Sequence, residues 1–307
     1  MSSSPGPSPS AVVPVTPKFF RPPVNDQIIH VNGRSYRLGQ QIGQGYFGAV
    51  YQCRDEWRNH LVAKILLPKG SYDDVRNQWQ DEIKKLVALR HPNITCVYDA
   101  FEFQDTFYLI LERCSSPLHD LICTPGIHGD TWLPYVAQPL LQAVDFMHRS
   151  GYVHKDIHPG NVYLNWVADP MVAAKPRVLQ FKVGDLGLSR LETDIKVFNT
   201  MLAQWMLPPE AIDPIQFGQV GRQIDVYHVG LLLLSLLMGK IPGFTQDEIA
   251  AGLPRQTAET LKSPYAAPIA HALRRHVIQR PQSALDLWRE INVIADALGV
   301  WKTSSLQ

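Results

Sequence analysis

Residues 154–161, which read HKDIHPGN, constrain the fold and the chemistry of this chain more than any other segment. They place Asp156 shortly before Asn161 on one polar loop. In phosphoryl transfer an aspartate accepts or orients the proton of the attacking hydroxyl group, and an asparagine holds a divalent ion against the nucleotide phosphates. A plain exposed loop is the alternative, so the rest of the chain has to supply the partners.

A glycine-rich segment lies upstream, between two strand-like runs at residues 35–41 and 49–54. It reads Gly43, Gln44, Gly45, Tyr46, Phe47, Gly48, Ala49, Val50. Glycines allow a tight hairpin whose backbone N–H groups approach phosphates without a Cβ in the way. An ordinary hairpin fits the same residues. A dinucleotide-binding turn fits less well, because strand-type residues follow where a helix is needed.

Lys64 ends an apolar run, and taken alone it would be a solvated lysine. Residues 72–89 predict an amphipathic helix. Its apolar positions recur at helical spacing: Val75, Trp79, Ile83, Leu86 and Leu89. Glu82 lies beside this stripe and would face a strand that carries Lys64, with Asp81 as the less favoured partner. A Lys64–Glu82 pair would orient the ammonium group toward nucleotide phosphates.

Together these segments resemble the eukaryotic-type protein kinase catalytic domain, over about residues 36–298. Residues 183–187, VGDLG, resemble its metal-binding D-F-G element, with Asp185 as the aspartate. Residues 207–210, LPPE, resemble A-P-E, and Arg280 resembles the late arginine that pairs with its glutamate, here Glu210. Asp225 opens an apolar helix and resembles the residue that anchors the catalytic loop.

The resemblance implies an α+β fold with two lobes. The small lobe, about residues 27–112, would be mostly β with one main helix, and the larger lobe, about 113–307, would be α-helical. ATP and Mg²⁺ are the implied cofactors, and a protein is the implied substrate. The implied catalytic residues are Lys64, Glu82, Asp156 and His158, and the metal ligands are Asn161 and Asp185. The nucleotide would contact Gly43, Gln44, Gly45, Tyr46, Phe47, Gly48, Val50 and Lys64, with Glu112 and Cys114 in the hinge and Leu111 as gatekeeper.

The residues leave more than one class of phosphoryl acceptor open. His158 stands where Ser/Thr kinases usually carry a lysine, and DIHPGN resembles a loop of small-molecule phosphotransferases related to aminoglycoside and choline kinases. Glu210, Asp225 and Arg280 favour a protein kinase. We therefore expect transfer to a protein hydroxyl group, of Ser or Thr. A small-molecule phosphotransferase and a pseudokinase scaffold are the alternatives, and the complete set of catalytic residues speaks against the scaffold.

Three further expectations concern the large lobe. Helices are expected at residues 134–149 and 283–298. Residues 165–175 lie in an unusually long spacer between Asn161 and Asp185, so we expect an exposed inserted loop, for which docking is one interpretation. Phosphate oxygens are expected to raise the pKa of His158. The alternative is that His158 only forms hydrogen bonds within its loop.

Composition narrows the partners and the compartment. A net charge of +1 gives no support for nucleic acid or an anionic membrane as a partner. The apolar run at 231–238 is too short to span a bilayer. Four cysteines without metal or disulfide spacing favour a reducing compartment, either the cytoplasm or, for a bacterial effector, a host cell. Residues 1–26 are rich in Ser and Pro and are expected to form a disordered tail before a kinase domain at 27–307. The oligomeric state stays open.

Overall fold

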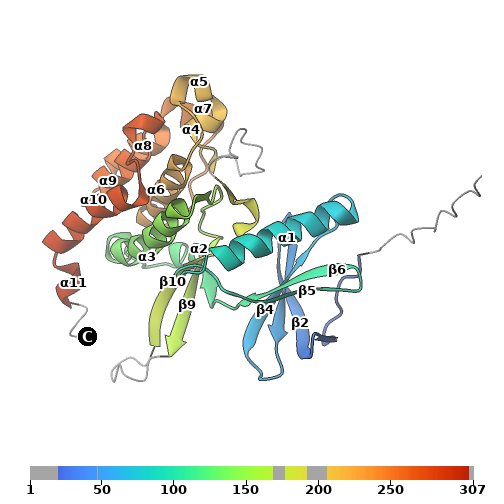
Figure 1. Cartoon of the computed structure of the whole chain (residues 1–307). Helices are drawn as coiled ribbons and strands as arrows, with labels where there is room; N and C mark the ends of the chain where they lie inside the picture. Colours follow the sequence, from blue (N-terminus) through green and yellow to red (C-terminus); the bar gives the residue numbers. More distant parts are fainter. Residues whose placement is uncertain (1–19, 47, 169–176, 192–205, 304–307) are drawn as a thin grey trace, which may run out of the picture.

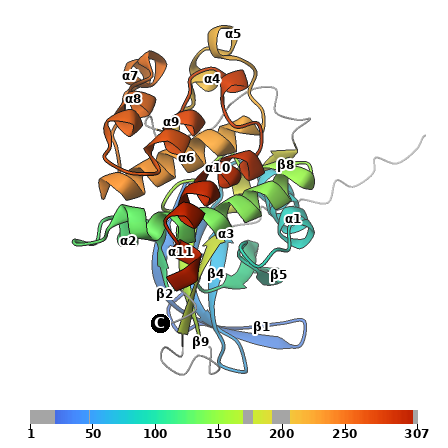
Figure 2. The ribbon, with the colours of Figure 1, turned by 90° about the vertical axis from the view of Figure 1, so that its left-hand side faces the viewer.

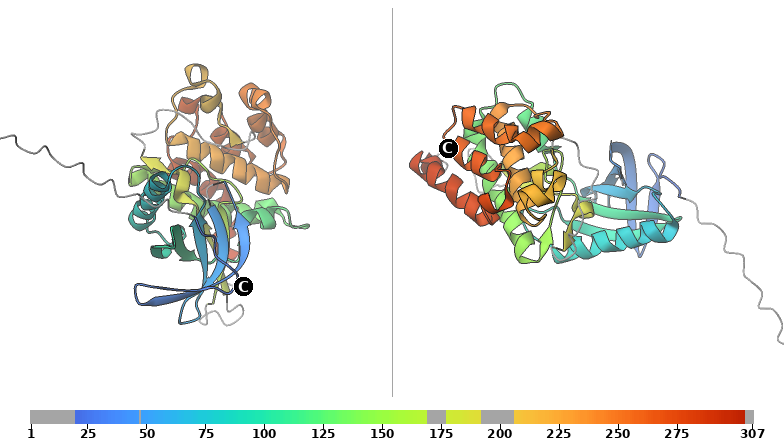
Figure 3. Two further views of the ribbon diagram at one scale, coloured as in Figure 1. Left: turned by 90° about the vertical axis from the view of Figure 1, so that its right-hand side faces the viewer. Right: turned by 90° about the horizontal axis from the view of Figure 1, so that it is seen from above.

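The structure is a computed structural model, which describes residues 20–46, 48–168, 177–191 and 206–303. The chain first forms an antiparallel β-sheet with one long helix and then a mostly helical region (Figure 1). Views from two other directions show the sheet and the helical region side by side (Figure 3). This is the two-lobed α+β architecture that the sequence predicts.

The sheet of the small lobe has six strands in the order β1-β2-β3-β4-β6-β5. They are β1 (Ile28–Val31), β2 (Arg34–Gln44), β3 (Gly48–Arg54), β4 (His60–Leu66), β5 (Val97–Phe103) and β6 (Thr106–Glu112). Along β6 the side chains alternate between two cores: Phe107 and Leu109 pack on the helix side, and Tyr108 and Ile110 pack on the other side. Because strand side chains point alternately to opposite faces, one apolar strand serves both cores.

Helix α1 (Tyr72–Ala88) lies against one face of this sheet (Figure 1). It begins at a capping box in which Ser71 and Asp74 satisfy each other's backbone N–H groups. Val75 and Leu86 are buried, and the Trp79 indole N–H donates to the backbone oxygen of Tyr108 at 3.0 Å. The helix ends one residue before the expected boundary, with Leu89 as its C-cap.

The large lobe is built around three mutually contacting helices, α3 (Gly129–Arg149), α6 (Gln223–Met238) and α10 (Ala284–Ala297) (Figure 2). Almost every residue of α6 is buried. The other helices are α2 (Leu118–Ile122), α4 (Pro209–Ile212), α5 (Pro214–Phe217), α7 (Gln246–Ala251), α8 (Leu253–Thr260), α9 (Ala266–Ala272) and α11 (Val300–Thr303), with 3-10 turns η1 (Leu186–Leu188) and η4 (Val277–Gln279). In the part of the chain that the structure describes, no helix has the length and apolarity needed to cross a membrane.

Helix α3 begins at Gly129, five residues before the expected start at Pro134. The expectation placed Pro134 in the first turn, where a missing N–H group does no harm. Instead the first turn of α3 packs directly on the end of α6, where a Cβ on Gly129 would come within 2.5 Å of the backbone oxygen of Leu236. This close packing outweighs the two hydrogen bonds that Pro134 and Pro139 remove from the helix.

The spacer after Asn161 forms a hairpin of two long strands, β9 (Val162–Ala168) and β10 (Arg177–Val183). With β7 (Ser116–Pro117) they make a sheet in the order β10-β9-β7, and β8 (Tyr152–Val153) pairs with β11 (Arg190–Leu191). The expected loop at 165–175 is therefore wrong for residues 165–168, which belong to β9. Residues 169–175 lie outside the described part. The prediction gave weight to small residues in the middle of the spacer and overlooked the strand-forming residues on either side.

Candidate active site

Three charged side chains from distant parts of the chain meet where the two lobes face each other. The ammonium group of Lys64, on β4, lies 2.7 Å from Glu82 Oε1 and 2.7 Å from Asp185 Oδ1. Lys64 and Glu82 are buried, so the interpretation of Lys64 as a solvated lysine is wrong. Glu82 is the partner from α1, whereas Asp81 pairs with the exposed Lys84.

The charges of this cluster shift one another's pKa values. Burial lowers the pKa of Lys64, but the carboxylates of Asp185 and Glu82 outweigh burial and raise it above its usual value. The ammonium group of Lys64 in turn holds the pKa of Asp185 below its usual range. Lys64 is therefore charged and Asp185 ionised at neutral pH, which is the state that a phosphate and a divalent ion require.

Asp185 lies in the turn after β10 with φ 56°, in the left-handed region that few residues other than glycine adopt. Its carboxylate accepts a hydrogen bond from the backbone N–H of Gly187 at 3.3 Å, and its side chain remains substantially exposed. The turn thus presents one carboxylate oxygen to Lys64 while leaving access from solvent. A metal ligand needs that access.

A second lysine on α1 reaches the same turn. The ammonium group of Lys85 lies 3.5 Å from the backbone oxygen of Leu186 and 3.4 Å from that of Gly187, and Lys85 is buried. Sequence reasoning missed this residue. The helical spacing could have identified Lys85. It lies about one turn after Glu82 and next to the buried Leu86, on the face of α1 that packs inward.

Asp156 and Asn161 are in direct contact in the loop after β8. The side-chain amide of Asn161 donates to Asp156 Oδ2 at 2.9 Å and to the backbone oxygen of Asp156 at 3.0 Å. The amide oxygen of Asn161 is then left for a cation, because the nitrogen is used within the loop. Burial raises the pKa of Asp156 to about 6.

Asp225, at the start of α6, fixes the loop that carries Asp156 through hydrogen bonds to the backbone of the loop. Its Oδ1 accepts from the Lys155 N–H at 2.8 Å, and its Oδ2 accepts from the His154 N–H at 2.8 Å and lies 2.9 Å from His148 Nε2. Lys155 has φ 72°, a strained value for a residue with a Cβ, so the two bonds from Asp225 stabilise a backbone turn that would otherwise be unfavourable. Asp225 has the anchoring position expected from the sequence.

His158 forms its hydrogen bond within the loop. Its Nδ1 accepts from the Gly160 N–H at 3.0 Å, and its Nε2 lies 3.9 Å from Asp156 Oδ2. Burial lowers the pKa of His158 to about 4, so the ring is neutral at pH 7 in the chain alone. The expected rise concerns phosphate oxygens beside the ring and stays a prediction, and burial acts against it. These contacts favour a role for His158 in fixing the conformation of the loop.

The glycine-rich segment forms the expected hairpin between β2 and β3. The Gly45 N–H donates to the backbone oxygen of Gly48 at 2.8 Å, while Phe47 lies outside the described residues. A Cβ on Gly48 would approach the backbone oxygen of Ile65 to 3.0 Å and Lys64 Cε to 3.3 Å. Glycine at position 48 therefore lets the hairpin lie directly over the side chain of Lys64.

The side chain of Glu112, in the hinge, points to the β9–β10 hairpin. Its carboxylate lies 2.8 Å from Lys182 Nζ and accepts from the Asn165 amide at 3.2 Å. Cys114 is partly buried, and burial raises the pKa of its thiol to about 12. Because the Glu112 carboxylate is already paired and the Cys114 thiol is uncharged, neither side chain offers charge to a nucleotide. This agrees with a hinge that binds through backbone groups.

The expected pair of Glu210 and Arg280 is confirmed. Arg280 Nη1 donates to Glu210 Oε1 at 2.7 Å and Nη2 to Oε2 at 2.6 Å, and both side chains are 0% exposed. Arg280 also donates to the backbone oxygens of Arg274, Arg275 and Gln223. The pair fixes the segment at α4 to the segment before α10.

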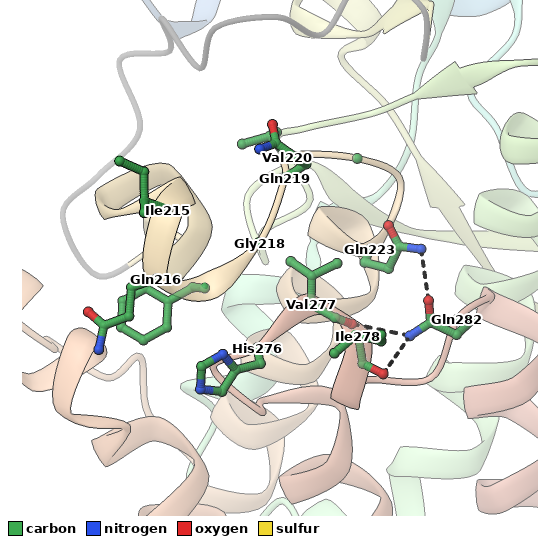
Figure 4. A pocket seen from close by; sticks show the side chains of 12 residues that line it. Ile215, Gln216, Gly218, Gln219, Val220, Gln223, His276, Val277, Ile278 and Gln282 are labelled. Atoms are coloured by element: carbon green, nitrogen blue, oxygen red, sulfur yellow. Dashed lines mark hydrogen bonds between the residues drawn. The ribbon is translucent and has the colours of Figure 1, made fainter.

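A cavity of about 480 Å³ lies near this pair and contains none of the candidate active-site residues. It is lined by α5, by the chain before α6 and by η4, and Gln282 closes one side through hydrogen bonds to Gln223 and to the backbone oxygens of Val277 and Ile278 (Figure 4). Its lining has neither a carboxylate nor a lysine. It therefore lacks the groups that a nucleotide–metal site needs.

Comparison with known proteins identifies the family of this chain. A family model described as "Protein kinase domain" matches residues 36–291, so the chain belongs to the protein kinase domain family. The curated relatives carry protein kinase names as well.

Two curated relatives show how far the likeness extends. The chain is 26% identical over 259 residues to the "Carbon catabolite-derepressing protein kinase" of Candida albicans. The aligned region covers 82% of this chain and 39% of that protein. The chain is 28% identical over 240 residues to "Calcium-dependent protein kinase 8" of Arabidopsis thaliana. This aligned region covers 75% of this chain and 42% of that protein. The chain thus spans about two fifths of the length of these relatives.

Proposed function

We propose that this chain transfers the γ-phosphoryl group of ATP to Ser or Thr hydroxyl groups of proteins, with Mg²⁺ as the metal. One observation carries the proposal above the others. The Lys64 ammonium group lies between Glu82 and Asp185, so the small lobe and the turn that carries Asp185 are joined as they would have to be for phosphoryl transfer.

Each residue of the site has a role that its contacts support. Lys64, held by Glu82, would bind the nucleotide phosphates, and the backbone N–H groups around Gly43, Gly45 and Gly48 would cover them. Asp156 would orient the substrate hydroxyl group and accept its proton. Catalysis would then consist of positioning these groups and stabilising charge, since the protein forms no covalent intermediate in this reaction.

The donor atoms fit Mg²⁺. Asn161 offers an amide oxygen and Asp185 a carboxylate oxygen, and Mg²⁺ prefers one or two such oxygen ligands together with water and substrate phosphates. When bound, the ion would neutralise charge on the phosphates. In keeping with so few protein ligands, no cluster of three or more His, Cys, Asp or Glu side chains that could hold a metal occurs among the described residues.

Protein acceptors are favoured over small molecules by the large lobe. The buried Glu210–Arg280 pair fixes α4, and Asp225 fixes the catalytic loop, as the protein kinase resemblance implies. We assign the kinase domain to residues 27–307, with the small lobe at 27–112. Four free cysteines support a reducing location, which we take to be the cytoplasm, or a host cell in the case of a bacterial effector.

The test is to incubate the purified protein with labelled ATP and Mg²⁺, and with separate panels of proteins and of small amino alcohols and amino sugars. We expect label on Ser and Thr of proteins. Asp156→Asn should keep nucleotide affinity and lose turnover by about two to four decades. Asp185→Asn should also weaken Mg²⁺-dependent nucleotide binding. Label on the small molecules alone would identify a small-molecule phosphotransferase, and no label on either panel would identify a scaffold.

A further inference from the structure

A second cavity, of about 350 Å³, lies between α3 and the β9–β10 hairpin, and none of the candidate catalytic residues lines it. We call it the α3–hairpin cavity. Trp132 and Tyr135 of α3 and Trp166 of β9 supply aromatic rings, and Gln138, Gln142 and Gln180 supply amides. Trp166 is 50% exposed, although an aromatic residue of this size is usually well buried. The proposed kinase reaction gives none of these residues a role.

The lining of this cavity has a particular chemistry. None of its residues is charged, and its lining combines aromatic rings with side-chain amides. Grooves of this kind bind proline-rich segments, because the rings pack on proline and the polar groups bond the exposed backbone oxygens of a polyproline II helix. Such a ligand arrives already extended, so it loses little conformational entropy on binding.

We propose that the α3–hairpin cavity binds the N-terminal segment of this same chain, residues 1–19. That segment holds five prolines, at positions 5, 7, 9, 14 and 17, five serines and no acidic residue. Its only charged side chain is that of Lys18, next to the folded domain. An uncharged proline-rich segment thus matches an uncharged aromatic cavity, and the inference goes beyond the proposed phosphoryl transfer.

The connection to the folded domain allows this contact. Arg21 is fixed to the first residue of β6, Thr106. Its N–H donates to Thr106 Oγ1 at 2.9 Å, and its backbone oxygen accepts from the same hydroxyl group at 2.9 Å. From there β5 runs back toward Asn93, which lines the cavity, over roughly 25–35 Å at ~3.3 Å per strand residue. Nineteen residues of polyproline II at ~3.1 Å each reach about 60 Å, so the segment spans this distance with length to spare.

Binding within one chain also benefits from proximity. A short tether gives an effective concentration in the millimolar range, so even a weak proline–aromatic contact would be populated. The site would then be occupied at any protein concentration. A segment supplied by a second copy would instead bind in a concentration-dependent way.

The first test uses the full chain and a variant in which all five prolines of residues 1–19 are alanine. Hydrogen–deuterium exchange is followed in residues 132–142 and 162–168 over a range of protein concentrations. We expect exchange in both segments to be slower in the wild type at every concentration, and we expect Trp166→Ala to abolish the difference. Trp57→Ala is the matched control, because Trp57 is 70% exposed in the turn between β3 and β4.

The second test adds a fluorescein-labelled peptide of residues 1–19 to the five-proline variant, whose own segment no longer competes. Fluorescence anisotropy should show binding that Trp166→Ala weakens by about tenfold or more, the loss expected for one aromatic contact of ~1.5 kcal/mol. Gln142→Lys, at an exposed position of α3, should weaken binding without affecting the melting temperature. Trp57→Ala should bind like the wild type.

Three outcomes would overturn the proposal. Equal exchange in the wild type and the five-proline variant would mean that residues 1–19 do not cover the cavity. Protection that grows with protein concentration would assign the cavity to a second copy of the chain. Peptide binding that survives both Trp166→Ala and Gln142→Lys would place the peptide elsewhere on the surface.

Discussion

The ammonium group of Lys64 lies 2.7 Å from a carboxylate oxygen of Asp185, although the two residues are 121 positions apart in the chain. Lys64 comes from the sheet of the small lobe, and Asp185 comes from the turn after β10 in the large lobe. Because Glu82 holds the same ammonium group at 2.7 Å, one lysine joins the sheet, helix α1 and the turn that carries Asp185. The lobes therefore meet through charge as well as through apolar packing.

Replacing Lys64 by methionine should abolish phosphoryl transfer and lower the melting temperature. Glu82 is 3% exposed and would keep a buried charge without its partner, at a cost of about 3–5 kcal/mol. Differential scanning calorimetry and a kinase assay measure the two effects. Lys84→Met is the control. The side chain of Lys84 is 73% exposed and pairs with Asp81 on the surface of α1, so this variant should leave the melting temperature and the activity unchanged. An unchanged melting temperature for Lys64→Met would mean that the pair is solvated.

The acid side of the pH–rate profile should report Asp156. Burial raises the pKa of this carboxyl group to about 6, and only the ionised form accepts the proton of the substrate. kcat/KM should therefore fall as the pH drops through about 6 and should be level above it. Measurement between pH 5 and 8 tests this. A fall centred near pH 4 would mean that Asp156 has an ordinary carboxyl pKa.

Both His158→Lys and His158→Ala should lower turnover to a similar degree. The backbone N–H of Gly160 loses its acceptor in either variant, because alanine has no polar group and lysine offers only donors. Gly160 is half-buried, so the loss is at most the about 1–3 kcal/mol of a buried donor without a partner. His158→Asn, which offers an oxygen acceptor, should retain more activity. If His158→Lys alone were as active as the wild type, charge rather than loop geometry would be the function of this residue.

The stability of the fold should also depend on His158 in acid. Its pKa in the folded chain is about 4, below the ordinary value of 6.5, so the unfolded chain binds more protons between these values. The contribution of the neutral ring is present above pH 6.5 and is lost as the pH falls toward 4. The wild type should therefore lose more stability than His158→Ala between pH 6.5 and 4, as urea unfolding at several pH values would show. Equal losses would contradict the low pKa.

Arg280→Ala should unfold the large lobe or make it insoluble. Glu210 is 0% exposed, and without the guanidinium group it would be a buried, unpaired carboxylate, at a cost of about 3–5 kcal/mol. The double variant Glu210→Leu with Arg280→Met removes both charges and should recover much of the loss, because isosteric apolar pairs replace buried ion pairs well. Urea unfolding compares the three proteins. Wild-type stability in Arg280→Ala would mean that the pair is weak or exposed.

The parts of the fold and site that the sequence predicted are those in which chemistry restricts the residue type. Glu82, Asp156 and Asp185 belong to ordered motifs whose proposed steps need a carboxylate, so the spacing of the motifs identified them. The part of β9 at residues 165–168 was missed because strand pairing depends on partners far along the chain, such as Gln180 opposite Asn165. The pKa of His158 was missed because it depends on burial, which a motif does not record.

Lys85→Met should weaken Mg²⁺-dependent nucleotide binding and turnover. The ammonium group of Lys85 contacts the backbone oxygens of Leu186 and Gly187, and these residues directly follow Asp185. Without it, α1 would hold the turn less firmly, and the Asp185 carboxylate would spend less time in position for a metal. Hydrogen bonds from charged groups contribute about 1.5–3 kcal/mol, and the long distances here favour the lower end, a loss of about tenfold in affinity.

Titration with a fluorescent ATP analogue, with and without Mg²⁺, separates this positioning role from a general loss of structure. In Lys85→Met the affinity should fall only in the presence of Mg²⁺, and Lys85→Arg, which keeps a cationic donor, should recover part of the loss. Lys84→Met, the neighbouring exposed lysine, should bind like the wild type under both conditions. Equal losses of affinity with and without Mg²⁺ in Lys85→Met would contradict this prediction. Lys85 would then stabilise the small lobe as a whole and not the position of the turn that carries Asp185.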